Sequence, residues 1–280
     1  QWRAPVPVIV VGNISVGGVG KTPLVIAIAN KLLATGFKVG VVSRGYGAAA
    51  TDFPYQVKVT DKATMVGDEP LLIAMRCDCP VIIDPKRVRA VDYLLKKHNV
   101  DVILSDDGLQ HYALGRNIEI AVINGAHPYG NGFYLPAGPL REGPQRLAKV
   151  DFVISNGKLK FSNLHTDKTF VMQIEASFLY NCLTQEVIEY TKINQPCKAV
   201  AAIGNADRFF NTLQEIGINA SQHRYPDHYN FKRKDFVQDT NQNIIMTAKD
   251  YVKCKEFATD NMYYLEVVAK LPGIFWDNLI

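Results

Sequence analysis

The sequence predicts an α/β fold in which a parallel sheet flanked by helices is followed by a second, smaller α/β lobe. Three observations lead to this prediction. Val6–Val11 is a continuous apolar, β-branched run, typical of a strand buried on both faces. Apolar strands then alternate with helical segments up to about residue 124, which is the pattern of βαβ units. A later buried strand, Ala199–Ile203, precedes another helical segment and opens the second lobe.

The composition is that of an ordinary globular protein. With 280 residues, 48% hydrophobic and 21% charged, the chain is not disordered, collagenous or coiled-coil. A net charge of +4 is too small to indicate a nucleic-acid partner, although it is compatible with an anionic substrate or membrane surface. The cysteines are scattered, and the Cys77/Cys79 spacing fits neither a redox pair nor a zinc knuckle, so a reduced cytosolic compartment is expected.

The expected elements follow from apolar periodicity. After Val6–Val11, strands are expected at Lys38–Val42, Val81–Asp84, Val100–Ser105, Ile118–Asn124 and Val150–Ser155, and helices at Pro23–Leu33, Glu69–Arg76 and Arg87–His98. Beyond residue 155, strands are expected at Thr169–Ala176, Glu186–Thr191, Ala199–Ile203, Ile244–Thr247 and Tyr263–Val268, and a helix at Asp207–Ile216. We predict lobes at residues 1–155 and 199–280, joined by a β-rich segment at 156–198. Gly125–Arg146, with five glycines and four prolines, has almost no periodicity, which is typical of a functional loop.

The strongest functional signal lies between the first strand and the first helix. The segment reads Ser15, Val16, Gly17, Gly18, Val19, Gly20, Lys21 and Thr22. In a phosphate-binding loop (P-loop), glycine amides and a helix N-terminus hold phosphate oxygens, the lysine reaches the β- and γ-phosphates, and the threonine hydroxyl binds Mg²⁺. Ser15 replaces the usual first glycine. The alternative is a glycine-rich turn that binds nothing, but the strand–loop–helix context favours a P-loop NTPase-like lobe that binds a nucleotide.

A P-loop needs an acidic partner for its metal ion at the end of another strand. Asp106 and Asp107 end the strand that begins at Val100, although Asp-Asp-Gly is also good turn chemistry. Gln110 and His111 continue the same loop, so both are expected near the phosphates. A structural role for His111 remains equally open.

Two further clusters are less specific. Asp68 precedes a helix, where it is either a helix N-cap or a carboxylate that orients a phosphate acceptor. Asp227 and His228 lie in a Tyr-Pro-Asp-His-Tyr segment, for which a surface turn is the simpler interpretation. The residues alone leave both alternatives open.

Taken together, these motifs resemble the tetraacyldisaccharide 4'-kinase family. The resemblance runs in order from about residue 5 to 255. Its segments are Pro7–Pro23, Ser43–Gly47, Val66–Pro70, Asp106–His111, Pro136–Glu142, Gly204–Asn205, Arg208–Phe210, Tyr225–His228 and Met246–Asp250. No single segment is unique to the family, but the ordered set is very specific.

The resemblance implies an ATP-dependent kinase with its site between two α/β lobes. It would phosphorylate the 4'-hydroxyl of a tetraacyl glucosamine disaccharide 1-phosphate, forming the lipid A precursor lipid IVA. Asp68 would be the catalytic base, assisted by His228, with Lys21 as the third catalytic residue. Thr22, Asp106, Asp107 and Glu142 would bind Mg²⁺. Arg87 and Arg141 would neutralise phosphate charge. The loop of residues 15–22, Gln110 and His111 would bind the nucleotide together with them.

The resemblance also implies a place in the cell. Family members act peripherally at the cytoplasmic face of the bacterial inner membrane, and they carry an amphipathic N-terminal segment that contacts the membrane. This sequence starts at Gln1, after the point where that segment would lie, so contact with an anionic membrane surface is expected through a missing N-terminal segment. We expect a monomer. Tyr229 stands where the family more often has histidine.

Two other functions compete with a kinase. A P-loop ATPase or GTPase switch often carries an additional lysine where this chain has Val16, and Thr247–Asp250 is only the nearest match to a guanine-reading motif. A binding domain with a non-functional loop is disfavoured because Lys21, Thr22 and Asp107 are all present. ATP consumption without a lipid acceptor would indicate the switch.

Overall fold

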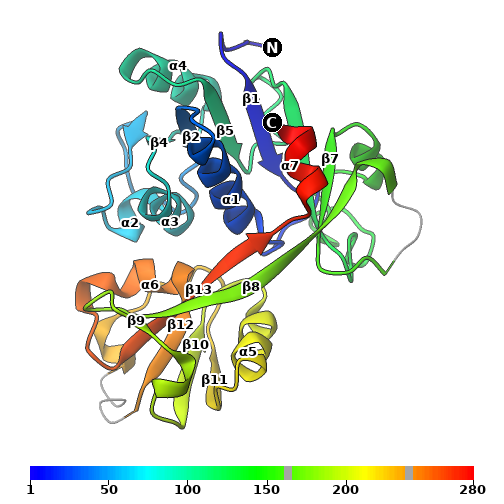
Figure 1. Ribbon diagram of the computed structural model, residues 1–280. Helices are drawn as coiled ribbons and strands as arrows, with labels where there is room; N and C mark the ends of the chain where they lie inside the picture. Colours follow the sequence, from blue (N-terminus) through cyan, green and yellow to red (C-terminus); the bar gives the residue numbers. More distant parts are fainter. Residues whose placement is uncertain (161–165, 237–241) are drawn as a thin grey trace.

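The computed structural model describes residues 1–160, 166–236 and 242–280 (Figure 1). Within these residues the strands form one sheet, in the order β11-β10-β12-β13-β8-β7-β6-β1-β5-β2-β4-β3, with β9 (Val187–Ile188) paired to β8. Most neighbouring strands are parallel. The antiparallel pairs are β3/β4, β8/β13 and β8/β9.

The first half of the sheet is built around β1. Its strands are β1 (Val8–Gly12), β2 (Val39–Ser43), β3 (Tyr55–Gln56), β4 (Val81–Ile83), β5 (Val102–Asp106), β6 (Ile118–Asn124) and β7 (Phe152–Asn156). Every residue of β1 is buried because helices or loops cover both of its faces. Ile9 and Val11 pack with α1 (Lys21–Ala34) and α3 (Asp68–Arg76), which follows α2 (Ala63–Val66). Val8 and Val10 pack with α4 (Arg87–Lys97) on the other face.

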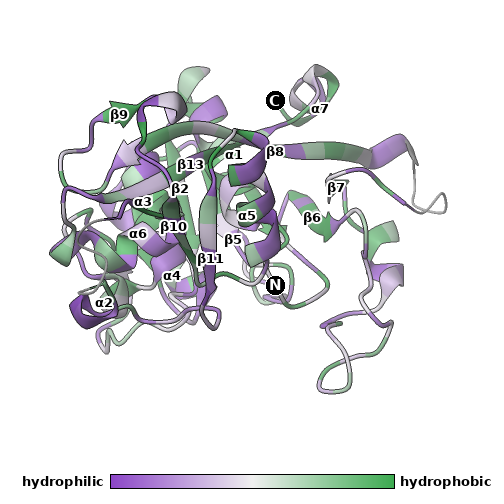
Figure 2. Cartoon of the chain, turned by 90° about the horizontal axis from the view of Figure 1, so that it is seen from below, coloured by the Kyte–Doolittle hydropathy of each residue, from purple (hydrophilic) through white to green (hydrophobic). Residues whose placement is uncertain are grey.

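The second half of the sheet has helices on both faces as well. Its strands are β10 (Cys197–Ala201), β11 (Ala220–Arg224), β12 (Ile244–Thr247) and β13 (Met262–Lys270). One face packs on α5 (Ala206–Glu215), and the other on α6 (Ala248–Cys254), which also contacts α3 of the first half. In Figure 2, β6 and β10 are coloured hydrophobic, whereas α5 mixes hydrophobic and hydrophilic residues, as an amphipathic helix does.

A long two-stranded ribbon joins the two halves. β8 (Thr169–Asn181) pairs with β7 through Thr169–Met172 and with β13 from Gln173 onward, so it belongs to both halves. Figure 1 shows β8 and β13 crossing from one half to the other. β13 leads into α7 (Gly273–Leu279), which lies beside β7. The division at residues 155 and 198 stays a prediction; the sheet itself continues through this segment.

The predicted α/β class, with a mostly parallel sheet flanked by helices, is confirmed. The expected strands at Ile118–Asn124 and Ile244–Thr247 have the predicted bounds, and most other elements differ by one or two residues. One expectation was wrong: Glu186–Thr191 holds only the two-residue β9 and a short 3₁₀ turn at Tyr190–Lys192. Most of its side chains are exposed, so the segment has no buried face that would extend a strand. Sequence periodicity also missed β3, β11, α2, α6 and α7.

Candidate functional site

A cavity of about 940 Å³ opens between the two halves, at the carboxyl end of β1. The first half lines it with residues 16–23, from the loop after β1 and the start of α1, with Asp106 and Asp107 at the end of β5, and with Arg44 and Tyr46 after β2. The second half contributes Gly204 and Asn205 before α5, Asp227 and His228 after β11, and Lys249 at the start of α6. Both halves are therefore needed to form its walls.

The loop after β1 has the backbone of a phosphate-binding turn. Gly17 and Gly20 have φ angles of +111° and +93°, which side chains other than glycine rarely adopt. A Cβ at Gly20 would also lie 2.6 Å from the Asn156 amide nitrogen. α1 begins at Lys21, so the N–H groups of Lys21 and Thr22 have no acceptors within the helix, and both residues line the cavity. Anions are stabilised at such a helix start.

The Gly125–Arg146 loop runs beside this turn and supports it. The Val16 amide donates to the Pro139 carbonyl at 2.8 Å, and the Arg141 amide donates to the Ile14 carbonyl at 2.7 Å. Tyr134, Leu135 and Leu140 of the same loop line the cavity. The irregular segment is therefore tied to the glycine-rich turn by backbone hydrogen bonds.

Two carboxylates end the strand next to the glycine-rich loop. β1 and β5 are parallel neighbours with Val11 opposite Asp106, which brings the Asp-Asp pair beside the loop. The Asp107 carboxylate lies 3.5 Å from Lys21 Nζ and 2.9 Å from Arg141 Nη1. Asp107 has a φ of +45°, an unusual backbone conformation of the kind that concentrates at functional sites.

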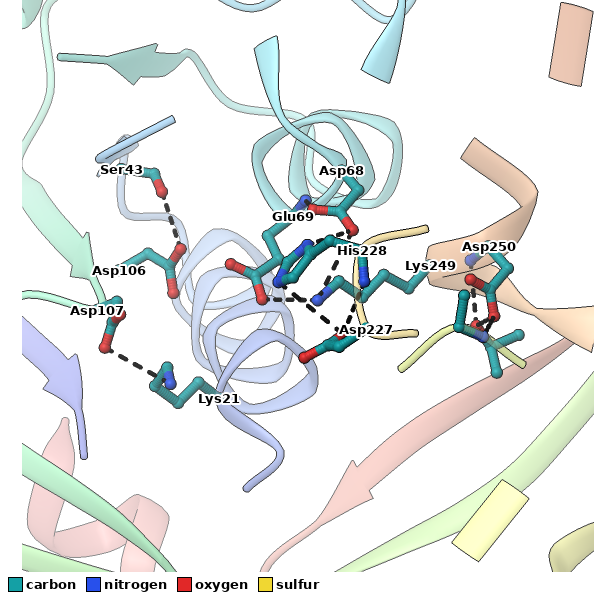
Figure 3. Close-up of polar contacts among 12 residues, drawn as sticks. Lys21, Ser43, Asp68, Glu69, Asp106, Asp107, Asp227, His228, Lys249 and Asp250 are labelled. Carbon is teal, nitrogen blue, oxygen red and sulfur yellow. Dashed lines mark hydrogen bonds and ion pairs between the residues drawn. The ribbon is translucent and has the colours of Figure 1, made fainter. Parts of the chain in front are cut away.

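The Asp106 carboxylate is fully buried and accepts a hydrogen bond from Ser43 Oγ at 2.9 Å (Figure 3). Burial, then the nearby charges of Glu69 and Asp107, raise the pKa of Asp106 above its ordinary value. Burial would raise the pKa of Asp107 too, but Lys21 and Arg141 lower it. The two carboxyl groups and Thr22, at the start of α1, all line the same cavity and offer it oxygen atoms.

A second polar cluster joins the two halves across the cavity. His228 Nδ1 donates to Asp68 Oδ2 at 3.0 Å, as Figure 3 shows. Asp68 is the first residue of α3, whereas His228 follows β11 with a φ of +60°. Burial acts to raise the pKa of Asp68, but the hydrogen bond from His228 and the charge of Lys249 lower it to about 2. The hydrogen bond to Asp68 raises the pKa of His228.

The N-cap alternative for Asp68 does not describe its geometry. The N-cap position of α3 is Gly67, and Asp68 Oδ1 accepts only from the amide of the next residue, Glu69. The carboxylate instead faces His228 and Lys249, which come from the other half of the molecule. Asp68 itself does not line the cavity, but its partners His228 and Lys249 and its neighbour Glu69 do, so its carboxylate contacts the cavity wall.

Other predicted site residues differ in their relation to the cavity. Gln110 and His111 line it, and burial followed by the charges of Arg87 and Arg44 lowers the pKa of His111 to about 4, so its ring is neutral at pH 7. Ser15, Arg87 and Glu142 do not line it. Ligand contacts of these three residues stay predictions that the geometry does not favour.

Arg87 and Glu142 have polar partners elsewhere, and Ser15 is buried. Arg87 is buried and donates to the carbonyls of Asp84 and Asp106, so it braces the ends of β4 and β5. Glu142 accepts from Gln110 at 2.5 Å and from Tyr112. Ser15 is buried, and its backbone forms an isolated β-bridge with Leu140.

Sequence reasoning missed several cavity residues. Arg44, Tyr46, Asn205, Arg208 and Lys249 all line the cavity, but none was predicted individually as a site residue. Each follows the carboxyl end of a strand, where α/β sheets place their ligands, and that position was the available signal.

Comparison with known proteins identifies the family of this chain. A sequence model of the family described as tetraacyldisaccharide-1-P 4'-kinase matches residues 1–280. The tetraacyldisaccharide 4'-kinase of Legionella pneumophila (strain Corby) is 52% identical, over 99% of this chain and 84% of the relative. The protein of that name in Histophilus somni (strain 2336) is 46% identical, over 98% and 82%. This chain belongs to the tetraacyldisaccharide-1-P 4'-kinase family.

A solved structure shares the fold of this family member. It is the "apo" form of LpxK from Aquifex aeolicus in complex with ATP, 28% identical, with a TM-score of 0.81 over 98% of this chain and 87% of that one. The predicted enzyme class, a phosphotransferase, is confirmed by the family. Of the helices in residues 1–160, 166–236 and 242–280, none combines the length and apolar character required to span a bilayer.

Proposed function

We propose that this tetraacyldisaccharide 4'-kinase family member transfers the γ-phosphate of ATP to the 4'-hydroxyl of a tetraacyl glucosamine disaccharide 1-phosphate. One observation carries the proposal: His228, which is hydrogen-bonded to the Asp68 carboxylate, lines the same cavity as the glycine-rich loop and Lys21. A candidate base for an acceptor hydroxyl and a cradle for a nucleotide thus lie at one cavity. The related LpxK structure, described as a complex with ATP, supports the choice of nucleotide.

The residues of the loop would bind and orient the phosphates. The amides at the start of α1 and the Lys21 ammonium lie where they can hold phosphate oxygens, and they offset the charge that spreads over the transferred group. The Lys21–Asp107 ion pair gives the lysine a fixed position. Arg141, whose guanidinium nitrogen contacts both Asp107 oxygens, adds a second cation at the same place.

The donor set fits a magnesium ion. In the described parts of the chain, no three His, Cys, Asp or Glu side chains are grouped so that they could hold a metal ion alone. Mg²⁺ in kinases is commonly held by one or two carboxylates together with substrate phosphates and water. Asp106, Asp107 and the Thr22 hydroxyl are oxygen ligands of the required kind. When bound, the ion would neutralise phosphate charge.

Asp68 would act on the acceptor. Its low pKa keeps the carboxylate ionised at neutral pH, so it can accept the hydrogen bond of an incoming hydroxyl and orient the hydroxyl oxygen toward the γ-phosphate. His228 holds Asp68 Oδ2 through its Nδ1–H group. The proton released from the hydroxyl would move to Asp68 as the new O–P bond forms and the bond to the leaving phosphate breaks.

The lipid part of the acceptor needs an apolar wall. Tyr134 and Leu135 line the cavity. With the preceding residue they form three consecutive exposed side chains: Phe133 is 63% exposed, Tyr134 54% and Leu135 53%. We assign this apolar tip, Phe133–Leu135, to contact with acyl chains. A lipid acceptor and cytosolic ATP meet at the inner face of the bacterial inner membrane, so peripheral attachment there is part of the proposal.

Transfer of labelled phosphate is the direct test. The protein is incubated with γ-³²P-labelled ATP, Mg²⁺ and the tetraacyl disaccharide 1-phosphate, and the products are separated by thin-layer chromatography. A labelled lipid that requires both substrates is expected, with little phosphate released when the acceptor is left out. Rapid acceptor-independent hydrolysis without labelled lipid would instead support a nucleotide switch.

The guanine-reading alternative has no support in the structure. Asp250, the nearest match to a base-reading aspartate, is fully buried and accepts from the Ala202 amide at 3.1 Å and from the Thr247 hydroxyl at 2.7 Å. Its carboxylate is thus engaged in holding the backbone of its own half. A switch of the GTPase kind would require it to face a base.

A further inference from the structure

Lys249 reaches from the second half of the molecule to the two acids at the start of α3. Its ammonium nitrogen lies 2.9 Å from Glu69 Oε1 and 3.7 Å from Asp68 Oδ2 (Figure 3). The three side chains are 18%, 27% and 7% exposed for Lys249, Glu69 and Asp68. Because water screens such a cluster poorly, the charge of Lys249 acts more strongly on Asp68 than it would at the surface.

The turn that carries Lys249 is fixed in place. Thr247 caps α6 by accepting from the Asp250 amide at 3.1 Å, and its hydroxyl donates to the Asp250 carboxylate. Asp250 also accepts from the Ala202 amide, while the Ala202 carbonyl accepts from the His228 amide at 3.3 Å. One hydrogen-bonded unit therefore presents both Lys249 and His228 to Asp68.

The charges around Asp68 have distinct positions. Asp68 Oδ2 is shared by His228 and Lys249, and Oδ1 accepts from the Glu69 amide. Lys253 also acts on Asp68 through its charge, but its ammonium pairs with Asp250 at 2.7 Å. Asp227 faces His228 and acts on Lys249 by its charge. Among these groups, Lys249 is the cation that contacts both Asp68 and Glu69.

We propose that Lys249 is a positioning residue for phosphate transfer: its ammonium fixes the Asp68 carboxylate for the acceptor hydroxyl and holds the adjacent Glu69 in an ion pair. The inference rests on the proposed function, since Asp68 must be the base that it orients. Burial acts to lower the pKa of Lys249, but the charges of Glu69 and Asp68 raise it, so the ammonium keeps its charge throughout the pH range of the enzyme.

Substitution of Lys249 separates positioning from a purely structural role. Lys249→Gln keeps a hydrogen-bond donor, on a shorter side chain, but removes the charge, and Lys249→Arg keeps the charge. The glutamine variant should lose about 10- to 100-fold in kcat, with the KM for ATP within about twofold of wild type. The acid limb of its kcat–pH profile should move to higher pH, because Asp68 loses a cation that lowers its pKa. The arginine variant should recover most of kcat and the wild-type acid limb.

A matched control and a coupling test complete the experiment. Lys255→Met removes a charge from the same segment, where Lys255 donates to the Val59 carbonyl, and should leave kcat and the pH profile unchanged. When Asp68 is already replaced by asparagine, adding Lys249→Gln should lower kcat by less than about threefold, because the two residues act as a unit.

The outcomes distinguish this inference from the proposed function. Wild-type protein that fails to phosphorylate the disaccharide overturns the function itself. Transfer by wild type, combined with a Lys249→Gln kcat within twofold and an unmoved acid limb, overturns the role of Lys249 and leaves the function intact. If the glutamine variant melts too low to assay, the arginine variant decides: a folded Lys249→Arg protein with a shifted acid limb contradicts the inference.

Discussion

Asp68 and His228 are 160 positions apart in the sequence and meet only in the folded protein. We expect Asp68→Asn to lower kcat by about 100-fold or more, because an amide cannot take the hydroxyl proton. His228→Ala should lower kcat less, by about 10- to 100-fold, because it removes the hydrogen bond that holds Asp68 but leaves the Asp68 carboxylate in place. Steady-state kinetics check both variants. The control is His98→Ala: His98 lies at the end of α4, where its ring is hydrogen-bonded to Gln56, and its replacement should leave kcat unchanged. Near wild-type turnover in both variants would remove the pair from the mechanism.

The same carboxylate links stability to pH. The pKa of Asp68 falls from 3.8 to about 2 on folding, so the ionised form is stabilised by on the order of 2 kcal/mol in the native state. Because the pKa of Asp68 is lower in the folded protein, its ionisation stabilises the fold at pH values above its pKa in the unfolded chain, near 4. This contribution is lost as the pH falls toward 2. Calorimetry should therefore find wild type more stable than Asp68→Asn at pH 6, with the difference in Tm narrowing by pH 3. A constant difference would argue against a shifted Asp68.

Among the elements, the start of α5 is set tightly against the glycine-rich loop. A Cβ at Gly204 would lie 2.9 Å from the Gly18 amide nitrogen, so Gly204→Ala must push one of the two backbones away. Phosphate binding depends on the position of that loop, and we expect the KM for ATP to rise about 10-fold. Gly273→Ala at the start of α7 is the matched control, because its Cβ would meet no atom within 4 Å. Equal KM values in both variants would show that the contact gives way freely.

Local sequence patterns predicted elements whose burial follows a clear period. β1, α1 and β5 have that property, so the amino-acid sequence alone was enough to bring the loop, Lys21 and the Asp-Asp pair together. α6 has only seven residues and β11 is a polar edge strand, and neither leaves a periodic signal. Lys249 and its partners depend on how α6 packs on α3, which is a long-range contact. The resemblance to a family identified Asp68 and His228, but spacing alone left both as turn or capping residues.

On the scale of the whole molecule, each half holds part of the site. The glycine-rich loop, Asp68 and the Asp-Asp pair belong to the first half, whereas His228 and Lys249 belong to the second. The halves are joined by the β8–β13 ribbon and by a half-buried ion pair at 2.5 Å between Arg76 of α3 and Glu266 of β13. The Asp68–His228 pair therefore forms only when the two halves are in contact, and in the mechanism proposed above that contact would also shield the acceptor from water.

The apolar tip at Phe133–Leu135 gives the molecule one side suited to lipid. Because these side chains are more than half exposed, burying them against acyl chains would remove apolar surface from water. Replacing all three with serine should raise the KM for the tetraacyl acceptor by at least about 10-fold, the equivalent of roughly 1.4 kcal/mol, and leave the KM for ATP unchanged. Leu183→Ser, which removes an equally exposed side chain near β9, should change neither KM. With an acceptor whose acyl chains have been removed, the triple variant and wild type should have the same KM. A similar rise with both acceptors would place the effect on the sugar or the loop backbone, and the acyl-chain assignment would fail.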